Sequence, residues 1–120
     1  MNTLIAMDIN LKTQQDIVIV EIVGDIDGKT SPVVQEKIFP LFTTNSKILL
    51  DMTQVSYMSS AGLRVLLTLY RQASANDSKL VLVGLSEEVA DIMEITGFFN
   101  FFTTCKTVET GLQKLNEHSI

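Results

Sequence analysis

The stretch Lys47–Tyr70, KILLDMTQVSYMSSAGLRVLLTLY, combines a buried strand, a short loop and the start of a helix. Residues Lys47–Met52 are mostly apolar and include three consecutive aliphatic side chains, which is typical of a strand covered on both faces. From Leu63 onward the apolar residues follow helical spacing instead. The stretch therefore predicts a central strand that leads into an amphipathic helix beginning between Ser59 and Leu63.

Two adjacent serines, Ser59 and Ser60, stand at the entrance of this helix. Either hydroxyl can act as N-cap by accepting a hydrogen bond from a backbone N–H of the first turn, and this structural role alone can account for both residues. Gly62 indicates a role beyond capping, because glycine in a helical turn costs roughly 0.5–1 kcal/mol of stability relative to alanine. It predicts that a group approaches the backbone closely there, and a partner protein and a phosphate are both candidates.

The other segments place this stretch in an open mixed α/β sheet. Residues Ile5–Leu11 alternate as in an edge strand, Lys12–Asp16 form a polar turn, and the β-branched run Ile17–Val23 pairs antiparallel with the first strand. A helix starts at Ser31-Pro32 and ends or bends near Phe39, before Pro40. The later elements are a buried strand, a helix capped by Ser86 and stopped by Gly97, an aromatic edge strand and a last helix: Lys79–Gly84, 86–96, Phe98–Phe102 and Val108–Leu115.

These elements predict about five strands, an N-terminal hairpin and four helices, with right-handed parallel crossovers after the hairpin. One continuous pattern over 120 residues predicts a single domain, residues 1–120, with 117–120 as a mobile tail. No apolar run approaches the ~20 residues of a membrane span, so we expect a cytoplasmic protein without membrane contact.

Charge and cysteine content limit the classes of function that the chain can have. Fourteen acidic against nine basic residues give a net charge of −5, which disfavours direct nucleic-acid binding, so that any role in transcription is expected to pass through proteins. The single cysteine, Cys105, has no internal disulfide partner and no surrounding metal-ligand pattern. It is expected to be a small structural residue.

An enzymatic role finds little support in the sequence. A nucleophile elbow at Ser60 would need glycine two residues earlier, where Met58 stands, and the only histidine, His118, lies in the tail. The sequence contains neither the phosphate-binding loop G-x-x-x-x-G-K-[ST] nor the dinucleotide-binding motif G-x-G-x-x-G after a strand. Asp25 and Asp27 alternate in a turn, where acids more often bond to local N–H groups than form a metal site.

Residues Tyr57–Leu63, YMSSAGL, within Asp51–Leu67, resemble the signature of the STAS-domain anti-sigma factor antagonists of bacteria. In that family an Asp precedes a phosphorylated Ser, which is followed by one small residue and Gly-Leu. Gly24–Asp27, GDID, falls where the family has a Gly-(Asp/Glu)-Leu-Asp turn. Ile95–Phe98, ITGF, falls where it has a Ser/Thr-Gly-Leu segment. The resemblance covers nearly the whole chain and implies the STAS fold.

The resemblance implies a binding module switched by phosphorylation. Ser60 takes the place of the phospho-acceptor, while Ser59 stands where the family has Asp and is the alternative acceptor. The unmodified protein would bind an anti-sigma factor that is also a serine kinase, phosphorylation would end that complex, and a PP2C-type phosphatase would restore it. The residues expected at the partner surface are Asp25, Asp27, Ser59, Ala61, Gly62, Leu63 and Arg64.

No catalysis, cofactor or metal is expected, and the chain should be a monomer or a weak dimer. The alternative function is a STAS module that binds a small ligand or assembles a signalling complex without sigma-factor control, in which case the serines act only as a helix cap.

Overall fold

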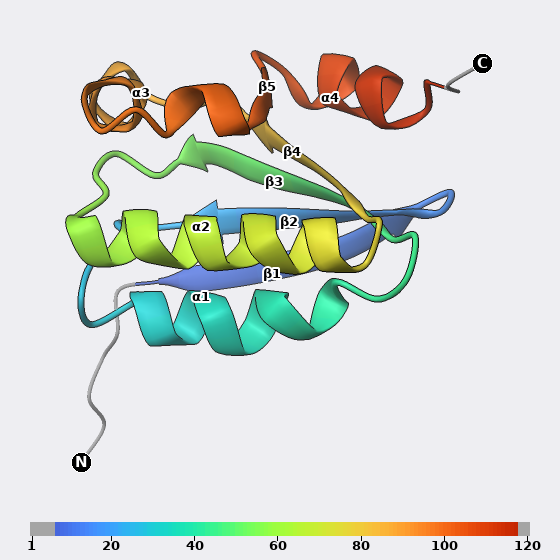
Figure 1. Cartoon of the computed structure of the whole chain (residues 1–120), viewed down its shortest axis with the longest axis horizontal. Coiled ribbons are helices and arrows are strands. Elements are labelled where there is room, and N and C mark those ends of the chain that lie inside the picture. Colours follow the sequence, from blue (N-terminus) through green and yellow to red (C-terminus); the bar gives the residue numbers. More distant parts are fainter. Residues whose placement is uncertain (1–6, 118–120) are drawn as a thin grey trace.

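The computed structural model describes residues 7–117, which form a five-stranded sheet in the order β1-β2-β3-β4-β5 (Figure 1). β1 and β2 form an antiparallel hairpin, and every later neighbouring pair is parallel. The predicted mixed sheet with an N-terminal hairpin and four helices is confirmed. In chain order the elements are β1 (Asp8–Gln14), β2 (Ile17–Val23), α1 (Ser31–Ile38), β3 (Lys47–Gln54), α2 (Ser60–Ala75), β4 (Lys79–Val83), α3 (Glu87–Ile95), β5 (Thr103–Cys105) and α4 (Val108–Leu115).

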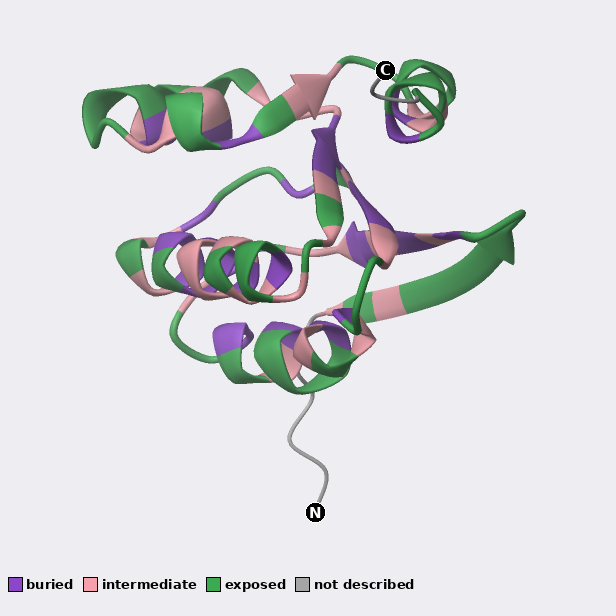
Figure 2. Cartoon of the chain, turned by 45° about the vertical axis from the view of Figure 1, so that its right-hand side comes forward, coloured by how far each residue is buried: buried purple, intermediate pink, exposed green. Residues whose placement is uncertain are grey.

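The helices cover the two faces of the sheet unequally (Figure 2). On the first face α1, α2 and α3 pack over one large core, to which the central strand contributes Ile48, Leu50 and Met52. On the second face α4 covers a smaller core, to which the same strand contributes Leu49. Because side chains alternate along a strand, a strand buried on both faces needs an unbroken apolar run. That requirement explains the aliphatic run in Lys47–Met52.

The first hairpin differs from the prediction. β1 continues to Gln14, and the turn contains only two residues, Gln15 and Asp16. The predicted polar turn at Lys12–Asp16 is wrong, because polar residues do not by themselves end a strand. An edge strand with exposed side chains accepts polar residues as long as its backbone pairs, and Lys12 lies opposite Ile19 in the ladder. The predicted strand begins at Ile5, which lies outside the described residues.

The aromatic segment is not a strand. Residues Phe99–Phe101 form a short 3-10 helix, and the edge strand β5 follows at Thr103–Cys105. A strand would send alternate rings to opposite faces, whereas the helical turn brings both Phe101 and Phe102 beside α2. Tyr70 of α2 stacks on Phe101 at 5.8 Å and meets Phe102 edge-on at 5.5 Å between ring centroids. The expected packing role holds for Phe102, which is buried.

The ends of the helices follow the local chemistry of the chain. α1 ends at Ile38 and continues as a 3-10 turn through Pro40, as the missing proline N–H requires. The Ser86 hydroxyl accepts a hydrogen bond from the N–H of Val89, so the predicted cap of α3 is confirmed. Gly97 adopts a φ of +81° just after this helix. No helix within residues 7–117 is long and apolar enough to span a membrane.

Candidate functional site

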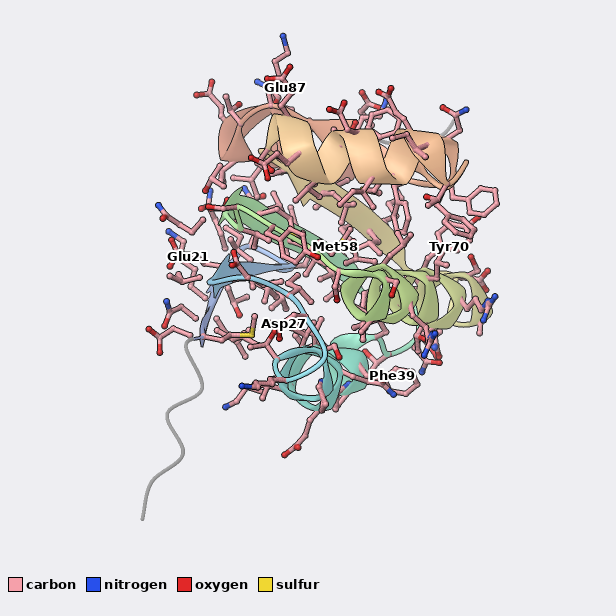
Figure 3. All side chains as sticks on the ribbon, turned by 90° about the vertical axis from the view of Figure 1, so that its left-hand side faces the viewer. Glu21, Asp27, Phe39, Met58, Tyr70 and Glu87 are labelled. Atoms are coloured by element: carbon pink, nitrogen blue, oxygen red, sulfur yellow. The ribbon has the colours of Figure 1, made fainter. Side chains whose placement is uncertain are left out.

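Two loops are joined by their backbones at the carboxyl ends of β2 and β3. Ile26 forms a parallel bridge with Met58: the Ile26 N–H donates to the Tyr57 carbonyl at 3.1 Å, and the Ser59 N–H donates to the Ile26 carbonyl at 2.9 Å. Figure 3 shows Met58 above Asp27 at this end of the sheet. The aspartate turn and the serine loop, both of which were expected at the partner surface, therefore lie side by side in the structure.

Gly62 permits this junction. A Cβ added at Gly62 would lie 2.6 Å from the Ile26 carbonyl oxygen and 2.5 Å from Cγ of Met58, distances that real Cβ atoms essentially never show. The group that approaches the glycine is therefore part of this chain. The prediction that a partner or a phosphate demands the glycine is wrong, because Gly62 is buried against the aspartate turn.

The two serines occupy different environments. Ser59 is the N-cap residue by position, with extended backbone angles (φ −86°, ψ 179°), yet its hydroxyl makes no cap hydrogen bond, so the predicted hydroxyl cap is wrong. Its Oγ is buried and finds no hydrogen-bond partner within residues 7–117. Ser60 is the first residue of α2 and is exposed. The junction with Ile26 holds the helix entrance, which makes a side-chain cap dispensable.

The surface around Ser60 is open and partly hollow. Arg64 is exposed one turn further along α2, and Ala61 is half-buried between them. Both line a hollow of about 440 Å³ between α1 and α2, opposite Ser31, Pro32, Gln35 and Glu36. Leu63 is only 5% exposed and packs into the core, so it supports this surface from beneath.

Tyr57 is a surface residue that the sequence did not identify. It precedes the buried Met58 and is itself 46% exposed. Exposed tyrosine is enriched in protein interfaces, because its ring offers a large apolar area and its hydroxyl a polar end. The available signal was its position in the loop next to the serines, but a sequence pattern cannot tell an exposed loop aromatic from a core one.

The two aspartates have different roles in their turn. The Asp27 carboxylate accepts hydrogen bonds from the N–H groups of Lys29 at 2.9 Å and Thr30 at 3.1 Å. The Thr30 N–H first, and then the Lys29 N–H, hold the pKa of this carboxyl below its ordinary value of 3.8. Asp25 carries an exposed side chain, and its carbonyl accepts from the Thr30 hydroxyl at 2.7 Å. No cluster of three metal-ligating side chains exists within residues 7–117. Asp27 thus shapes the loop that displays Asp25.

Comparison with known proteins defines the family. The family model of the STAS domain matches residues 8–111. The chain belongs to the STAS domain family. It is 29% identical over 107 residues to the anti-sigma-B factor antagonist of Bacillus subtilis strain 168, an alignment that covers 89% of this chain and 98% of that relative. It is 38% identical over 78 residues to the anti-sigma-B factor antagonist of Listeria monocytogenes, covering 63% of this chain and 68% of the relative.

Solved structures share the STAS fold. The anti-sigma factor antagonist SpoIIAA in its unphosphorylated form superposes with a TM-score of 0.75 at 18% identity, over 94% of this chain and all of that one. The phosphorylated form of SpoIIAA from Bacillus gives a TM-score of 0.69 at 18% identity, over 91% of this chain and all of that one. At this identity the likeness establishes the fold alone.

Replacing Gly62 by alanine should destabilise the STAS fold, because the new Cβ would collide with the Ile26 carbonyl and with Met58. We expect the free energy of unfolding to fall by about 1–3 kcal/mol, the range typical of overpacking. Gly28→Ala is the matched control, since a Cβ there meets nothing within 4 Å. Urea titrations of the three proteins measure the difference, and equal midpoints for Gly62→Ala and wild type would contradict the proposed fit.

The depressed pKa of Asp27 predicts a pH-dependent stability. A carboxyl whose pKa is lower in the folded state stabilises that state above its unfolded pKa and loses this effect as the pH falls through the folded value. Wild type should therefore be more stable than Asp27→Asn at pH 7, and the gap should close below the ordinary value of 3.8.

Denaturation of both proteins from neutral to acidic pH tests this linkage. Asp25→Asn is the control, because its exposed carboxylate accepts no hydrogen bond from the described residues. A gap between wild type and Asp27→Asn that stays constant with pH would show that the carboxylate's charge is not involved.

Proposed function

We propose that this STAS protein is an anti-sigma factor antagonist controlled by phosphorylation of Ser60. In its unphosphorylated form it binds an anti-sigma factor with serine kinase activity and thereby frees a sigma factor. The kinase ends the complex by phosphorylating Ser60, and a PP2C-type phosphatase restores it. Relatives named anti-sigma-B factor antagonist support this role, and the observation that carries it is the exposed serine at the start of α2 beside the aspartate turn. These partners would place the protein in the cytoplasm.

The different exposure of the two serines supports Ser60 as the acceptor. A kinase must bring the hydroxyl oxygen in line with the phosphate that it transfers, so the oxygen has to be accessible. Ser60 is exposed, whereas Oγ of Ser59 is buried. Ser59 also lacks the negative charge that the family's Asp would place beside the phosphate.

The partner surface would combine the exposed side chains around Ser60. Asp25, Tyr57 and Arg64 offer an acid, an aromatic ring and a base in reach of the same partner, and the hollow beside Ala61 can receive a partner side chain. The other expected members, Asp27, Ser59, Gly62 and Leu63, would contribute indirectly, because their hydrogen bonds and burial fix the backbone that presents this surface.

The proposed action is binding without catalysis. A serine nucleophile needs a base within hydrogen-bond reach, and no histidine exists within residues 7–117. His118, the one histidine of the sequence, falls outside the described residues. The hollow beside Ser60 is open to solvent between two helices, whereas catalysis usually requires a site that excludes water.

A phosphorylation assay distinguishes Ser60 from Ser59 as the acceptor. On incubation with ATP and the kinase encoded in the source cell, wild type and Ser59→Ala should each gain the mass of one phosphate, and Ser60→Ala should gain none. Intact-mass spectrometry measures the three products. Phosphate uptake by Ser60→Ala at the wild-type rate, with none by Ser59→Ala, would reassign the acceptor.

A pull-down from the same cells extends the test to function. Ser60→Ala should retain the anti-sigma factor kinase in the presence of ATP, because phosphorylation cannot end this complex. If neither wild type nor Ser60→Ala retains such a protein, the proposed function is wrong and the STAS module instead serves ligand binding or complex assembly.

Phosphate on Ser60 should weaken partner binding without unfolding the protein. A phosphate adds about −1.5 to −2 charges at a helix N-terminus, where free N–H groups and the helix dipole favour negative charge by roughly 0.3–1 kcal/mol. The loss must therefore occur at the interface, through the bulk and hydration of the phosphate and through repulsion from Asp25.

Amide chemical shifts and partner affinity report these two effects separately. Shift changes in the phosphorylated protein should be confined to the start of α2 and the two loops, while affinity for the kinase falls at least tenfold. Ser60→Asp should act in the same direction but less strongly, because it adds only one charge. Shift changes throughout β2 and β3, or undiminished affinity of the phosphoprotein, would contradict a local mechanism.

A further inference from the structure

β1 forms a free edge of the sheet, opposite the edge formed by β5. Among the described residues β1 pairs only with β2, and six of its seven residues are exposed. Leu11, in the middle of the strand, keeps 51% of its surface in contact with solvent. A long edge strand with an exposed aliphatic residue is a template for pairing with another strand.

The register of the hairpin shows which backbone groups of β1 are available. Gln14 lies opposite Ile17 across a two-residue turn, and in such hairpins this pair exchanges both hydrogen bonds. Bonded and non-bonded pairs alternate along an antiparallel ladder, so the even-numbered residues of β1 bond to β2. Residues Ile9, Leu11 and Thr13 therefore direct their N–H and C=O groups to the free edge.

We propose that two copies of this chain associate through antiparallel pairing of their β1 strands, with Asn10 of each copy on the twofold axis. In this register Ile9 lies opposite Leu11 of the second copy, and their backbone groups are the ones that face the free edge. Asp8 lies opposite Lys12 of the second copy. Because of the twofold symmetry, each of these pairs occurs twice in the dimer.

Charge and apolar complementarity favour this register. Even-numbered side chains share one face of the sheet and odd-numbered ones the other, so both Asp8–Lys12 pairs lie on one face and both Ile9–Leu11 pairs on the opposite face. Directly opposed side chains interact at Cβ separations of about 4.5–5.5 Å. Moving the twofold axis to Leu11 would place Asp8 opposite Gln14 and Lys12 opposite Asn10, which removes both charge pairs.

The side chains involved are free to form these contacts. Neither Asp8 nor Lys12 forms an ion pair with any residue in the range 7–117, where the salt bridges join Asp16 to Lys47 and Lys114 to Glu117. The Asn10 amide donates to Glu21 at 2.9 Å, which steadies the residue on the axis. β1 contributes no residue to the surface around Ser60, so the dimer would present two copies of that site.

Charge reversal at the two positions tests the proposal independently of sigma-factor control. Asp8→Lys and Lys12→Asp each replace two attractive pairs by two repulsive ones, and each should raise the dimer dissociation constant roughly tenfold or more. An equimolar mixture of the two variants should associate again, because one variant then carries a base at both positions and the other an acid at both, which restores both opposite-charge pairs. The double variant Asp8→Lys/Lys12→Asp should recover the homodimer.

Sedimentation equilibrium up to millimolar concentration measures all of these proteins. Lys106→Asp, an exposed reversal just after β5 at the opposite edge of the sheet, is the matched control and should behave as wild type. Leu11→Pro is a second variant, since its N–H faces the free edge; it should keep the hairpin and abolish the dimer. A monomeric wild type, single reversals that match the control, or a mixture that associates no better than its components would each overturn the proposal.

Discussion

The two hydrogen bonds between Ile26 and the serine loop are the constraint on which the site depends. They extend the parallel pairing of β2 and β3 beyond the strands by one isolated bridge. A loop of this kind would otherwise lose conformational entropy on ordering without compensation. The bridge orders both loops at once, and Gly62 lets α2 start directly above it. The aspartate turn, the serine loop and the first turn of α2 therefore behave as one rigid unit.

This unit explains why two neighbouring serines differ. Once the Ser59 N–H is bonded to Ile26, the backbone direction at the helix entrance is fixed, and the Ser59 side chain turns inward while Ser60 turns outward. The same rigidity lets a charge arrive at Ser60 without disturbing the core, because the strands beneath are already held by their own pairing.

The sequence predicted most of the fold because the decisive signals were local. Buried strands, the Ser86 cap and the proline stop depend on neighbours within one or two turns of chain. The failures have long-range causes. Polar residues continue β1 because β2 pairs with them, and Phe101 of the aromatic segment stacks on Tyr70, which lies 31 positions earlier in the chain. For the site, the predicted strand order brought the serine loop and the aspartate turn to the same edge, but Gly62 is needed because a Cβ there would meet Met58 and also Ile26, which lies 36 positions earlier. No local pattern reports such a contact.

Some residues of the candidate site hold its backbone in place, and others are available to a partner. Gly62, Leu63 and Asp27 satisfy demands made within the chain, by packing or by backbone hydrogen bonds. The motif around Ser60 contains both kinds of residue. Burial distinguishes the two kinds. The side chains that remain exposed around Ser60 are an acid, Asp25, a base, Arg64, and an aromatic ring, Tyr57. Because hydrogen bonds already hold the backbone beneath this surface, a partner would lose little conformational entropy on binding, and the proposed phosphate on Ser60 would act through repulsion and bulk at the surface rather than through a change of fold.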